Sequence, residues 1–251
     1  MSRSRGQSSE LLYGRNAVIE GLRGRRTPRC LYLAEGVERQ ERVAGLLAEA
    51  ERRRLPVKRL KAPALEQLAP HVNHQGVLLE VGAYPYVQLD QLLAGAGGRP
   101  LVVLDHIQDV QNFGTLIRTA DATGAAGLII PDRRGVSVTP AVVNSSAGAV
   151  EHVAIARVPN LARALDETKE AGYWAVGLAV EPPAESIFRS DIPEPALLIV
   201  GSEGGGIGPA LRKHCDLLVQ LPMLGKVESL NAAVAGSVAL YELLRRRLPA
   251  D

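Results

Sequence analysis

The sequence predicts an α/β protein with a small N-terminal α/β domain and a larger C-terminal domain built on a mostly parallel sheet with helices on both faces. A length of 251 residues allows two domains that each bury a core. Helical segments separate most of the apolar runs in the second half, and such runs are typical of strands buried on both faces. These runs are LVVLD, GLIIP, HVAIA, YWAVGLA, ALLIV and LLVQL.

Shorter elements alternate along the N-terminal part. Apolar periodicity predicts helices over residues 16–23, 38–54 and 63–69 and strands over residues 29–34, 56–60 and 76–81. Glycine and proline then interrupt the pattern. We therefore expect a flexible tail at residues 1–10, an N-terminal domain at 11–81, a linker at 82–98 and a C-terminal domain at 99–251.

The composition is typical of a soluble protein. Hydrophobic residues make up 46% of the chain and charged residues 22%, and no apolar run reaches the roughly 18 residues of a membrane span. Cys30 and Cys215 form no disulfide framework, which favours a reducing cytoplasm and a place in the core for both. His71 and His74 lack further ligands nearby in the sequence, so we expect no metal site.

Positive charge is concentrated in the N-terminal part. Residues 1–97 contain 15 Lys and Arg against 10 Asp and Glu, whereas residues 98–251 contain 14 against 17. Guanidinium groups match phosphate oxygens, so these clusters favour nucleic acid as a partner over the alternative of solvated helix ends. The clusters comprise Arg23, Arg25, Arg26 and Arg29, and then Arg52, Arg53, Arg54, Lys58, Arg59 and Lys61.

The stretch IQDVQNFGTLIRTADATGA, residues 107–125, combines a helical core stripe with polar residues. Gly114 lies one turn before Arg118, which predicts a slot beside the guanidinium, with Asn112 lining it from the start of the helix. From these residues alone an alternative stays open, in which Asn112 caps the helix and Arg118 pairs with Asp121 on the surface. The predicted core stripe consists of Phe113, Leu116, Ile117 and Ala120.

A second loop, GSEGGGIG, follows the ALLIV strand and contains five glycines in eight residues. Such density indicates a tight turn or close contact between the backbone and a small molecule. The loop has neither the ending of a P-loop nor a G-x-G-x-x-G fingerprint, which argues against a nucleotide triphosphate site and weakens a dinucleotide site. Glu203 is its ionisable residue and is expected to orient a polar partner.

A third loop follows the LLVQL strand. Leu221-Pro222-Met223 leaves the strand, and Ser229-Leu230-Asn231 opens a helix with small residues that permit close packing. Ser229 could be a helix cap. A serine hydrolase is disfavoured because no G-x-S-x-G elbow is present. The carboxyl ends of parallel strands meet at one edge of a sheet, so we expect all three loops to open there together.

The three loops resemble the motifs of the SpoU (TrmH) family of RNA ribose 2′-O-methyltransferases, in the SPOUT class. The resemblance covers about residues 101–247. The sequence departs from the family at two places. It has Asp109-Val110 where Asp-Pro is common, and Ala232-Ala233 after Asn231 where Val-Ser or Val-Ala is usual. Both departures leave the polar motif residues in place. The motifs are matched by Asn112, Gly114 and Arg118, by Gly201, Glu203 and Gly204, and by Leu221-Pro222-Met223 with Ser229-Leu230-Asn231.

The resemblance implies a deep trefoil knot, a homodimer formed through the knotted domain, and S-adenosyl-L-methionine as cofactor. It implies a central catalytic role for Arg118, which we expect to bind a substrate phosphate because a guanidinium is a poor base. The implied catalytic residues are Arg118, Asn112, Glu203, Ser229 and Asn231, and the implied cofactor-binding residues are Gly201, Leu221, Met223 and Leu230.

The N-terminal segments LLYGRNAVIEGL and HQGVLLEV are similar to the ribosomal-protein-like substrate-binding domain of the branch that methylates guanosine in 23S ribosomal RNA. Transfer RNA enzymes of the family generally lack this domain, so ribosomal RNA is the expected substrate. The residues expected to bind RNA are Arg15, Arg52, Arg53, Arg54 and Arg118.

Alternative functions are a non-catalytic RNA-binding or ribosome-assembly protein on the same fold, and a 2′-O-methyltransferase for another ribosomal or transfer RNA nucleotide. A nicotinamide-dependent oxidoreductase is disfavoured because the dinucleotide fingerprint is absent from the sequence.

Overall fold

The computed structural model describes residues 9–133 and 135–249, and the chain divides into two compact units. Unit 1 comprises Met1–Pro85 with Val138–His152, and unit 2 comprises Tyr86–Ser137 with Val153–Asp251. Of the tail predicted at residues 1–10, residues 1–8 lie outside the described residues. Ser9 and Glu10 belong to the first strand of unit 1, which the sequence pattern did not predict.

Unit 1 contains a four-stranded mixed sheet in the order β1-β4-β2-β3. The central strand β4 is antiparallel to β1 and β2, and β3 is parallel to β2 at the edge. The strands are β1 (Ser9–Tyr13), β2 (Pro28–Ala34), β3 (Val57–Leu60) and β4 (Val77–Gly82).

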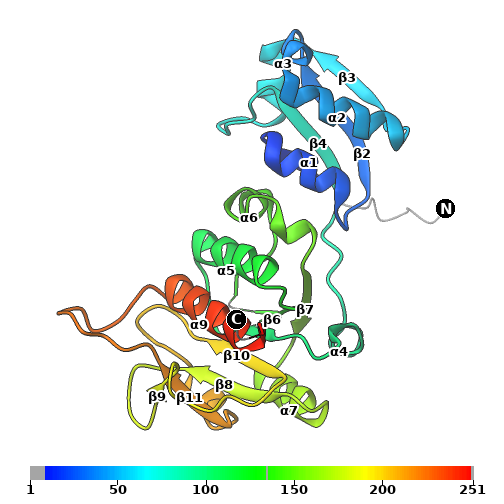
Figure 1. Ribbon diagram of the computed structural model, residues 1–251. Helices are drawn as coiled ribbons and strands as arrows, with labels where there is room; N and C mark the ends of the chain where they lie inside the picture. The colour runs from blue at the N-terminus through cyan, green and yellow to red at the C-terminus, as the bar shows by residue number, and fades with distance from the viewer. Residues whose placement is uncertain (1–8, 134, 250–251) are drawn as a thin grey trace. The chain divides into compact units, whose positions relative to one another are not determined.

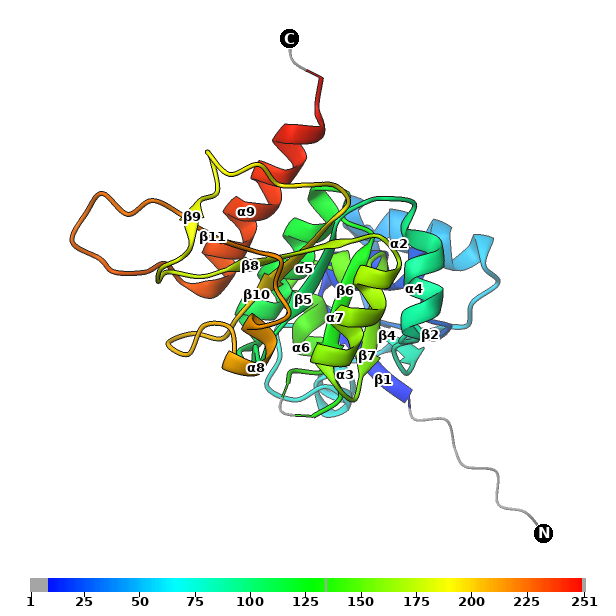
Figure 2. The same cartoon turned by 90° about the horizontal axis from the view of Figure 1, so that it is seen from below.

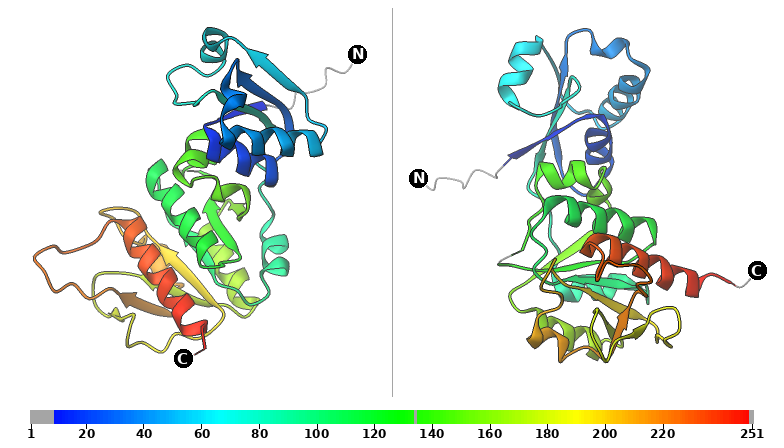
Figure 3. Two further views of the ribbon diagram at one scale, coloured as in Figure 1. Left: turned by 45° about the horizontal axis from the view of Figure 1, so that its top comes forward. Right: turned by 90° about the vertical axis from the view of Figure 1, so that its left-hand side faces the viewer.

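Helices cover both faces of this sheet (Figure 3). Helix α1 approaches one face closely because Gly21 has no side chain: a Cβ there would lie 2.5 Å from Leu12 Cδ1 and 3.1 Å from Leu79 Cδ2. On the other face, Leu65 packs with Leu78 in a small apolar cluster. The helices are α1 (Arg15–Arg23), the short η1 (Val37–Arg39), α2 (Glu41–Arg52) and α3 (Ala62–Leu68).

Residues 138–152 also fold with unit 1, although the sequence pattern places them in the C-terminal domain. This segment contains α6 (Pro140–Ser145) and η2 (Ala149–Glu151). Its Glu151 is fully buried and pairs with the buried Arg26 at 3.0 Å, and His152 Nε2 lies 2.6 Å from Glu20 Oε2. Long-range ion pairs of this kind cannot be seen in a local pattern, so the structural unit differs from the sequence boundary.

Unit 2 contains a seven-stranded sheet in the order β7-β6-β5-β10-β8-β11-β9, and its recorded strand pairs are all parallel. This confirms the predicted parallel sheet, and the six predicted apolar runs all contribute strands to it. The strands are β5 (Leu101–Leu104), β6 (Gly127–Pro131), β7 (Ala154–Val158), β8 (Trp174–Leu178), β9 (Glu185–Ser186), β10 (Ala196–Val200) and β11 (Leu217–Gln220).

Helices pack on both faces of the sheet of unit 2 (Figure 2). Leu92 of α4 and Leu165 of α7 bury one face together with Val103 and Leu197 of the sheet. Phe113 and Leu116 of α5 are fully buried, and α9 packs beside α5. The helices are α4 (Leu89–Ala96), α5 (Val110–Ala122), α7 (Leu161–Glu170), the short α8 (Pro209–Arg212) and α9 (Ala232–Arg247).

The linker predicted at residues 82–98 is shorter in the structure, because α4 lies inside it. Leu89, Leu92 and Ala96 are buried in the core of unit 2, and Val87 N donates to Ile155 O at 3.0 Å. The glycines and prolines on both sides of α4 are typical of a linker and mask its short amphipathic pattern.

Helices α5 and α9 pack very closely (Figure 1). A Cβ on Gly236 would lie 2.6 Å from Leu116 Cδ2 and 3.1 Å from Val200 Cγ2, and the Thr119 and Ser237 hydroxyls are 2.8 Å apart. The small-residue face expected for this helix is therefore its packing face. To reach it, the chain returns from β11 near the sheet edge to the centre, the path expected of the trefoil knot.

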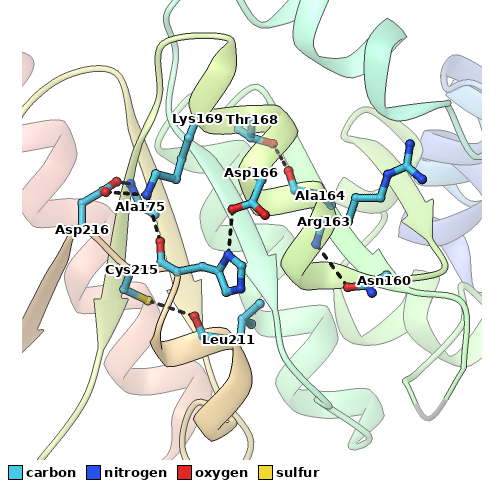
Figure 4. A network of polar contacts seen from close by, with 11 residues as sticks. Asn160, Arg163, Ala164, Asp166, Thr168, Lys169, Ala175, Leu211, Cys215 and Asp216 are labelled. Atoms are coloured by element: carbon cyan, nitrogen blue, oxygen red, sulfur yellow. Dashed lines mark hydrogen bonds and ion pairs between the residues drawn. The ribbon is translucent and has the colours of Figure 1, made fainter.

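A polar network joins α7 to the amino ends of β8 and β11 (Figure 4). Asp216 accepts a hydrogen bond from Ala175 N at 2.9 Å and pairs with Lys169 at 2.6 Å, while His214 contacts Asp166 at 2.7 Å. His214 and Asp216 flank Cys215 in the sequence, and the structure adds their distant partners Asp166 and Lys169. Burial raises the pKa of the Cys215 thiol to about 11, so it is a poor nucleophile.

Cys30 is buried, as predicted, whereas Cys215 is partly exposed. Among the described residues, no group of three or more His, Cys, Asp or Glu residues could hold a metal ion. No helix in the described part of the chain has the length and apolarity needed to cross a membrane.

Candidate active site

The parallel sheet brings four loops to one edge of unit 2, because β5, β8, β10 and β11 all run in the same direction. Three of them are the loops singled out by sequence. The fourth follows β8, which lies between β10 and β11 in the sheet. The loop after β8 therefore opens at the same edge of the sheet as the three predicted loops.

The loop after β5 is fixed by two aspartates. Asp109 caps α5 by accepting a hydrogen bond from Asn112 N at 2.8 Å. Asp105 is buried and accepts from Gly208 N at 2.7 Å, which ties this loop to the glycine-rich loop after β10. Because Asp109 is the cap, the side chain of Asn112 is available for other contacts.

The glycine-rich loop folds back on itself. Ser202 N donates to Gly206 O at 3.1 Å, and Gly206 N donates to Ser202 O at 2.9 Å. A Cβ on Gly201 would lie 2.0 Å from the carbonyl carbon of Gly206, so a side chain cannot fit there. The loop's own turn therefore explains part of its glycine content, and Glu203 lies within this turn.

The loop after β11 ends at Asn231, which caps α9. Asn231 Oδ1 accepts from Ala233 N at 2.9 Å and from Val234 N at 3.2 Å. Asn231 is therefore the cap, and Ser229 is exposed on the preceding loop. The capping role that the sequence allowed for Ser229 is filled by Asn231.

Three predicted site residues form one polar cluster, which we name the amide–carboxylate cluster: Asn112, Glu203 and Asn231. Asn112 Nδ2 donates to Glu203 Oε1 at 2.7 Å, and Asn231 Nδ2 donates to Asn112 Oδ1 at 3.0 Å and to Glu203 Oε1. Asn112 lies in the first turn of α5, Glu203 in the glycine-rich loop and Asn231 at the cap of α9. Asn112 and Asn231, which are 119 positions apart in the sequence, are thus joined by a direct hydrogen bond.

A pocket opens beside this cluster. It is lined mainly by apolar side chains and backbone, and Glu203 is the one ionisable residue among those lining it. The loop after β8 supplies residues that the sequence pattern missed, although the same edge rule predicts that the carboxyl end of this strand opens there. The lining residues are Leu178, Ala179, Val180, Val200, Gly201, Ser202, Glu203, Gly204, Gly206, Leu221, Met223, Ser229, Leu230, Ala232 and Ala235.

A second, polar hollow adjoins the pocket, and Glu203 and Ser202 line both. The second hollow also contains His106, whose Nδ1 contacts the buried Asp105. The amide–carboxylate cluster therefore separates an apolar pocket from a polar one. The polar hollow is lined by His106, Ile107, Gln108, Asp109, Asn112, Ser202 and Glu203.

Arg118 lies outside both hollows. It is exposed on α5, and the structure records no hydrogen bond or ion pair between its side chain and any other described residue. The surface pairing with Asp121 that the sequence left open is thus not formed. Gly114 is buried on the same helix.

The other predicted RNA-binding residues lie in unit 1. Arg15 contacts Gln40, and Arg52 and Arg53 both pair with Glu49, at 2.6 and 2.7 Å. Arg54 is exposed and has a positive φ of 54°; its backbone N donates to Glu51 O at 2.9 Å, and its side chain makes no recorded contact within the described chain. The basic cluster at 52–54 is therefore partly neutralised by its own helix.

The pocket suits S-adenosyl-L-methionine in its chemistry. Apolar walls and backbone groups fit an adenosine and a methionine chain, and the negative charge of Glu203 at the rim is opposite to that of a sulfonium. The four predicted cofactor-binding residues, Gly201, Leu221, Met223 and Leu230, all line it.

Comparison with known proteins agrees with this geometry. Residues 99–241 match the model of the SpoU rRNA Methylase family, and residues 11–87 match the model for RNA 2'-O ribose methyltransferase substrate binding. A Putative TrmH family tRNA/rRNA methyltransferase, YacO of Bacillus subtilis, is 40% identical over 97% of this chain and 98% of its own length.

Solved structures show the same fold. The SpoU methyltransferase AviRb from Streptomyces viridochromogenes, in complex with AdoMet, aligns with a TM-score of 0.78 and 28% identity over 95% of this chain and 90% of its own. The TrmH/SpoU tRNA modifying enzyme of A. aeolicus aligns with a TM-score of 0.55 and 27% identity over 63% of this chain and 80% of its own.

The fold and the pocket define a methyltransferase of the SPOUT class, with an additional N-terminal substrate-binding domain. The chain belongs to the SpoU rRNA methylase family. It is an S-adenosyl-L-methionine-dependent RNA 2′-O-ribose methyltransferase, as the sequence motifs predicted.

Proposed function

We propose that this enzyme methylates the 2′-hydroxyl of a guanosine in 23S ribosomal RNA. The observation that carries the site assignment is the pair of adjoining hollows that share Glu203. Methyl transfer needs a donor pocket beside an acceptor site, and the apolar pocket and the polar hollow supply this arrangement. When bound, S-adenosyl-L-methionine supplies a methyl group on a positively charged sulfur.

The amide–carboxylate cluster positions the acceptor. Asn112 and Asn231 both donate hydrogen bonds to the Glu203 carboxylate. These bonds fix the carboxylate at the place where the two hollows adjoin. A fixed carboxylate can orient the target ribose by accepting a hydrogen bond from it. Ser229, at the rim of the apolar pocket, adds a hydroxyl to the same region.

Arg118 binds a substrate phosphate and stabilises negative charge that develops on the 2′-oxygen. A guanidinium stays protonated in proteins and makes a poor base, so the proton of the hydroxyl passes to a phosphate oxygen of the RNA. The exposure of Arg118 and its lack of recorded partners in the described chain support a role toward RNA.

We further propose a homodimer formed through unit 2. Helix α9 exposes Val234, Val238 and Tyr241, spaced four and three residues apart on one side. Their opposite side packs on α5, so an apolar stripe is left uncovered in a single chain. A second copy fits this stripe, and light scattering of the wild type against Val238→Asp tests it: a wild-type monomer would contradict the dimer.

Unit 1 supports ribosomal RNA as the substrate. The A. aeolicus tRNA modifying enzyme aligns with 63% of this chain, whereas AviRb aligns with 95%. An enzyme with the additional domain is therefore expected to act on a larger, structured RNA. Arg15, Arg52, Arg53 and Arg54 are proposed to contact that RNA.

Incubation with ribosomal RNA, transfer RNA and labelled cofactor tests the proposal, followed by mapping of the 2′-O-methyl position. Methylation of a 23S guanosine is expected. Methylation confined to transfer RNA would overturn the substrate assignment. A protein that binds RNA but gives no heat with S-adenosyl-L-methionine in a calorimeter would instead be a non-catalytic binding protein.

A further inference from the structure

A basic hollow lies in unit 1, apart from the cluster at 52–54. It has a volume of about 390 Å³ and is bordered by three arginines, Arg25, Arg26 and Arg29. The other lining residues are Thr27, Gly82, Ala83 and Pro85, which are small or rigid and carry no charge. We name this feature the arginine hollow.

Arg25 is anchored at its backbone and at one nitrogen of its side chain. Its backbone N donates to Glu151 O at 3.0 Å, and its Nε donates to His152 O at 3.3 Å. Its two terminal nitrogens have no recorded partner among the described residues. The guanidinium therefore stays exposed with donors available, while its position is set by residues 151 and 152.

Arg26 forms the rigid wall of the hollow. Its side chain is fully buried, and it pairs with Glu10 at 2.7 Å and with Glu151 at 3.0 Å. Its guanidinium also lies 5.4 Å from the centre of the Tyr84 ring. Two carboxylates offset the charge of Arg26, so the exposed guanidinium of Arg25 supplies positive charge that a ligand meets.

The two arginine clusters of unit 1 thus differ. Glu49 takes hydrogen bonds from both Arg52 and Arg53, which holds the pKa of its carboxyl down to about 2. The donors of that cluster are partly occupied by a carboxylate on a convex helix end. In the arginine hollow, the carboxylates of Glu10 and Glu151 pair with the buried Arg26. Neither pairs with Arg25, whose guanidinium stays exposed.

We propose that the arginine hollow binds a phosphate group of the RNA backbone. Guanidinium groups converging on a small hollow match the size and the several acceptor oxygens of a phosphodiester. The hollow contains no feature for reading a base, so it serves to position RNA rather than to select a sequence. This inference rests on the proposed function, because it takes RNA as the substrate.

Single and double substitutions Arg25→Ala and Arg29→Ala test the proposal in the full-length protein. The measurement is RNA affinity by fluorescence anisotropy at several salt concentrations. Each lost phosphate contact lowers the slope of log affinity against log salt by roughly 0.7 to 0.9, so the double variant is expected to lose up to about 1.8 units of slope and about tenfold or more in affinity.

Arg163→Ala is the matched control, since Arg163 is an exposed arginine of unit 2 that pairs with Glu167. It is expected to leave affinity and slope unchanged. Circular dichroism and cofactor binding show whether the variants remain folded. A double variant that binds RNA with the same slope as Arg163→Ala would overturn the proposal.

Two further measurements separate the possible failures. If the wild type binds RNA through the arginine hollow but transfers no methyl group, the proposed function fails and the phosphate site stands. If it methylates RNA while the double variant keeps full affinity, the phosphate site alone fails. Inorganic phosphate is the second probe: binding of phosphate that RNA does not displace would overturn the assignment to RNA.

Discussion

One ionisable side chain stands among the fifteen residues lining the apolar pocket of unit 2, whereas three of the seven residues lining the arginine hollow of unit 1 are arginines. The first set is suited to recognition of a small cofactor by shape and backbone contact. The second set is suited to recognition of a polyanion by charge, as proposed above. Substitutions, pH and salt are therefore expected to act differently on the two units.

The largest expected effect lies in unit 2, where chemistry takes place. Arg118→Ala should lower turnover by about 10²–10³-fold, the usual cost of removing one donor that stabilises developing charge. Cofactor binding should stay unchanged, because Arg118 does not line the pocket. Single-turnover methyl transfer and calorimetry measure the two quantities.

Arg118→Lys separates charge from geometry. A partial rescue of turnover is expected, since the charge returns without the bidentate fork. Equal loss of turnover and of cofactor affinity in Arg118→Ala would show that the residue is structural.

The next effect concerns unit 1 and pH. Burial raises the pKa of Glu151 to about 7, despite the opposing charge of Arg26. A carboxyl with a raised folded pKa binds its proton more tightly when folded. Its stabilising contribution is therefore complete below about pH 4.5 and is lost as the pH rises through about 7, by at most about 3 kcal/mol.

Urea unfolding at about pH 5 and about pH 8 measures this loss, which should shrink in Glu151→Gln because that side chain does not titrate. Glu170→Gln, an exposed carboxyl of unit 2, is the control and should keep the dependence of the wild type. The same pH dependence in Glu151→Gln as in the wild type would contradict this origin.

The third effect tests recognition by the backbone in unit 2. Gly201→Ala forces a Cβ to within 2.0 Å of the Gly206 backbone, so the loop must open. Overpacking of this kind costs about 1–3 kcal/mol, which corresponds to roughly tenfold to hundredfold weaker cofactor binding. Calorimetry with S-adenosyl-L-methionine measures it.

Gly225→Ala is the control for this substitution, since nothing lies within 4 Å of a Cβ at that position and its φ is not positive. It should bind the cofactor normally. If Gly201→Ala also bound normally, the glycine-rich loop would not shape the pocket.

The sequence predicted six of the seven strands of the sheet of unit 2, because buried parallel strands are continuous apolar runs, a local signal, whereas the two-residue β9 has no such run. ALLIV, for example, is β10 over its full length. The meeting of Asn112, Glu203 and Asn231 was also predictable, because the carboxyl ends of parallel strands share one edge. The same rule, applied to β8, would have added Val180 to the pocket.

What could not be predicted depends on contacts between distant segments. Glu151 joins unit 1 through its pair with Arg26, 125 positions earlier, and no local pattern shows such a pair. Likewise, the sequence shows eight arginines in two clusters of unit 1, but only the structure shows that Glu49 pairs with Arg52 and Arg53 in one cluster and that the other borders a hollow.

The smallest expected effect sharpens the difference between those two clusters. Substituting Arg52 and Arg53 together by Ala removes two charges that Glu49 already partly neutralises, and it also frees the Glu49 carboxylate. RNA affinity is therefore expected to fall only about two- to fivefold, and the salt slope by less than the roughly 0.7 per residue of a direct phosphate contact. The triple variant that adds Glu49→Ala removes the unpaired negative charge and should recover part of the affinity. Should the Arg52 and Arg53 pair cost more affinity and slope than Arg25 with Arg29, the main phosphate contacts would lie at the end of α2, and the carboxylate of Glu49 would have to give up its partners when RNA binds.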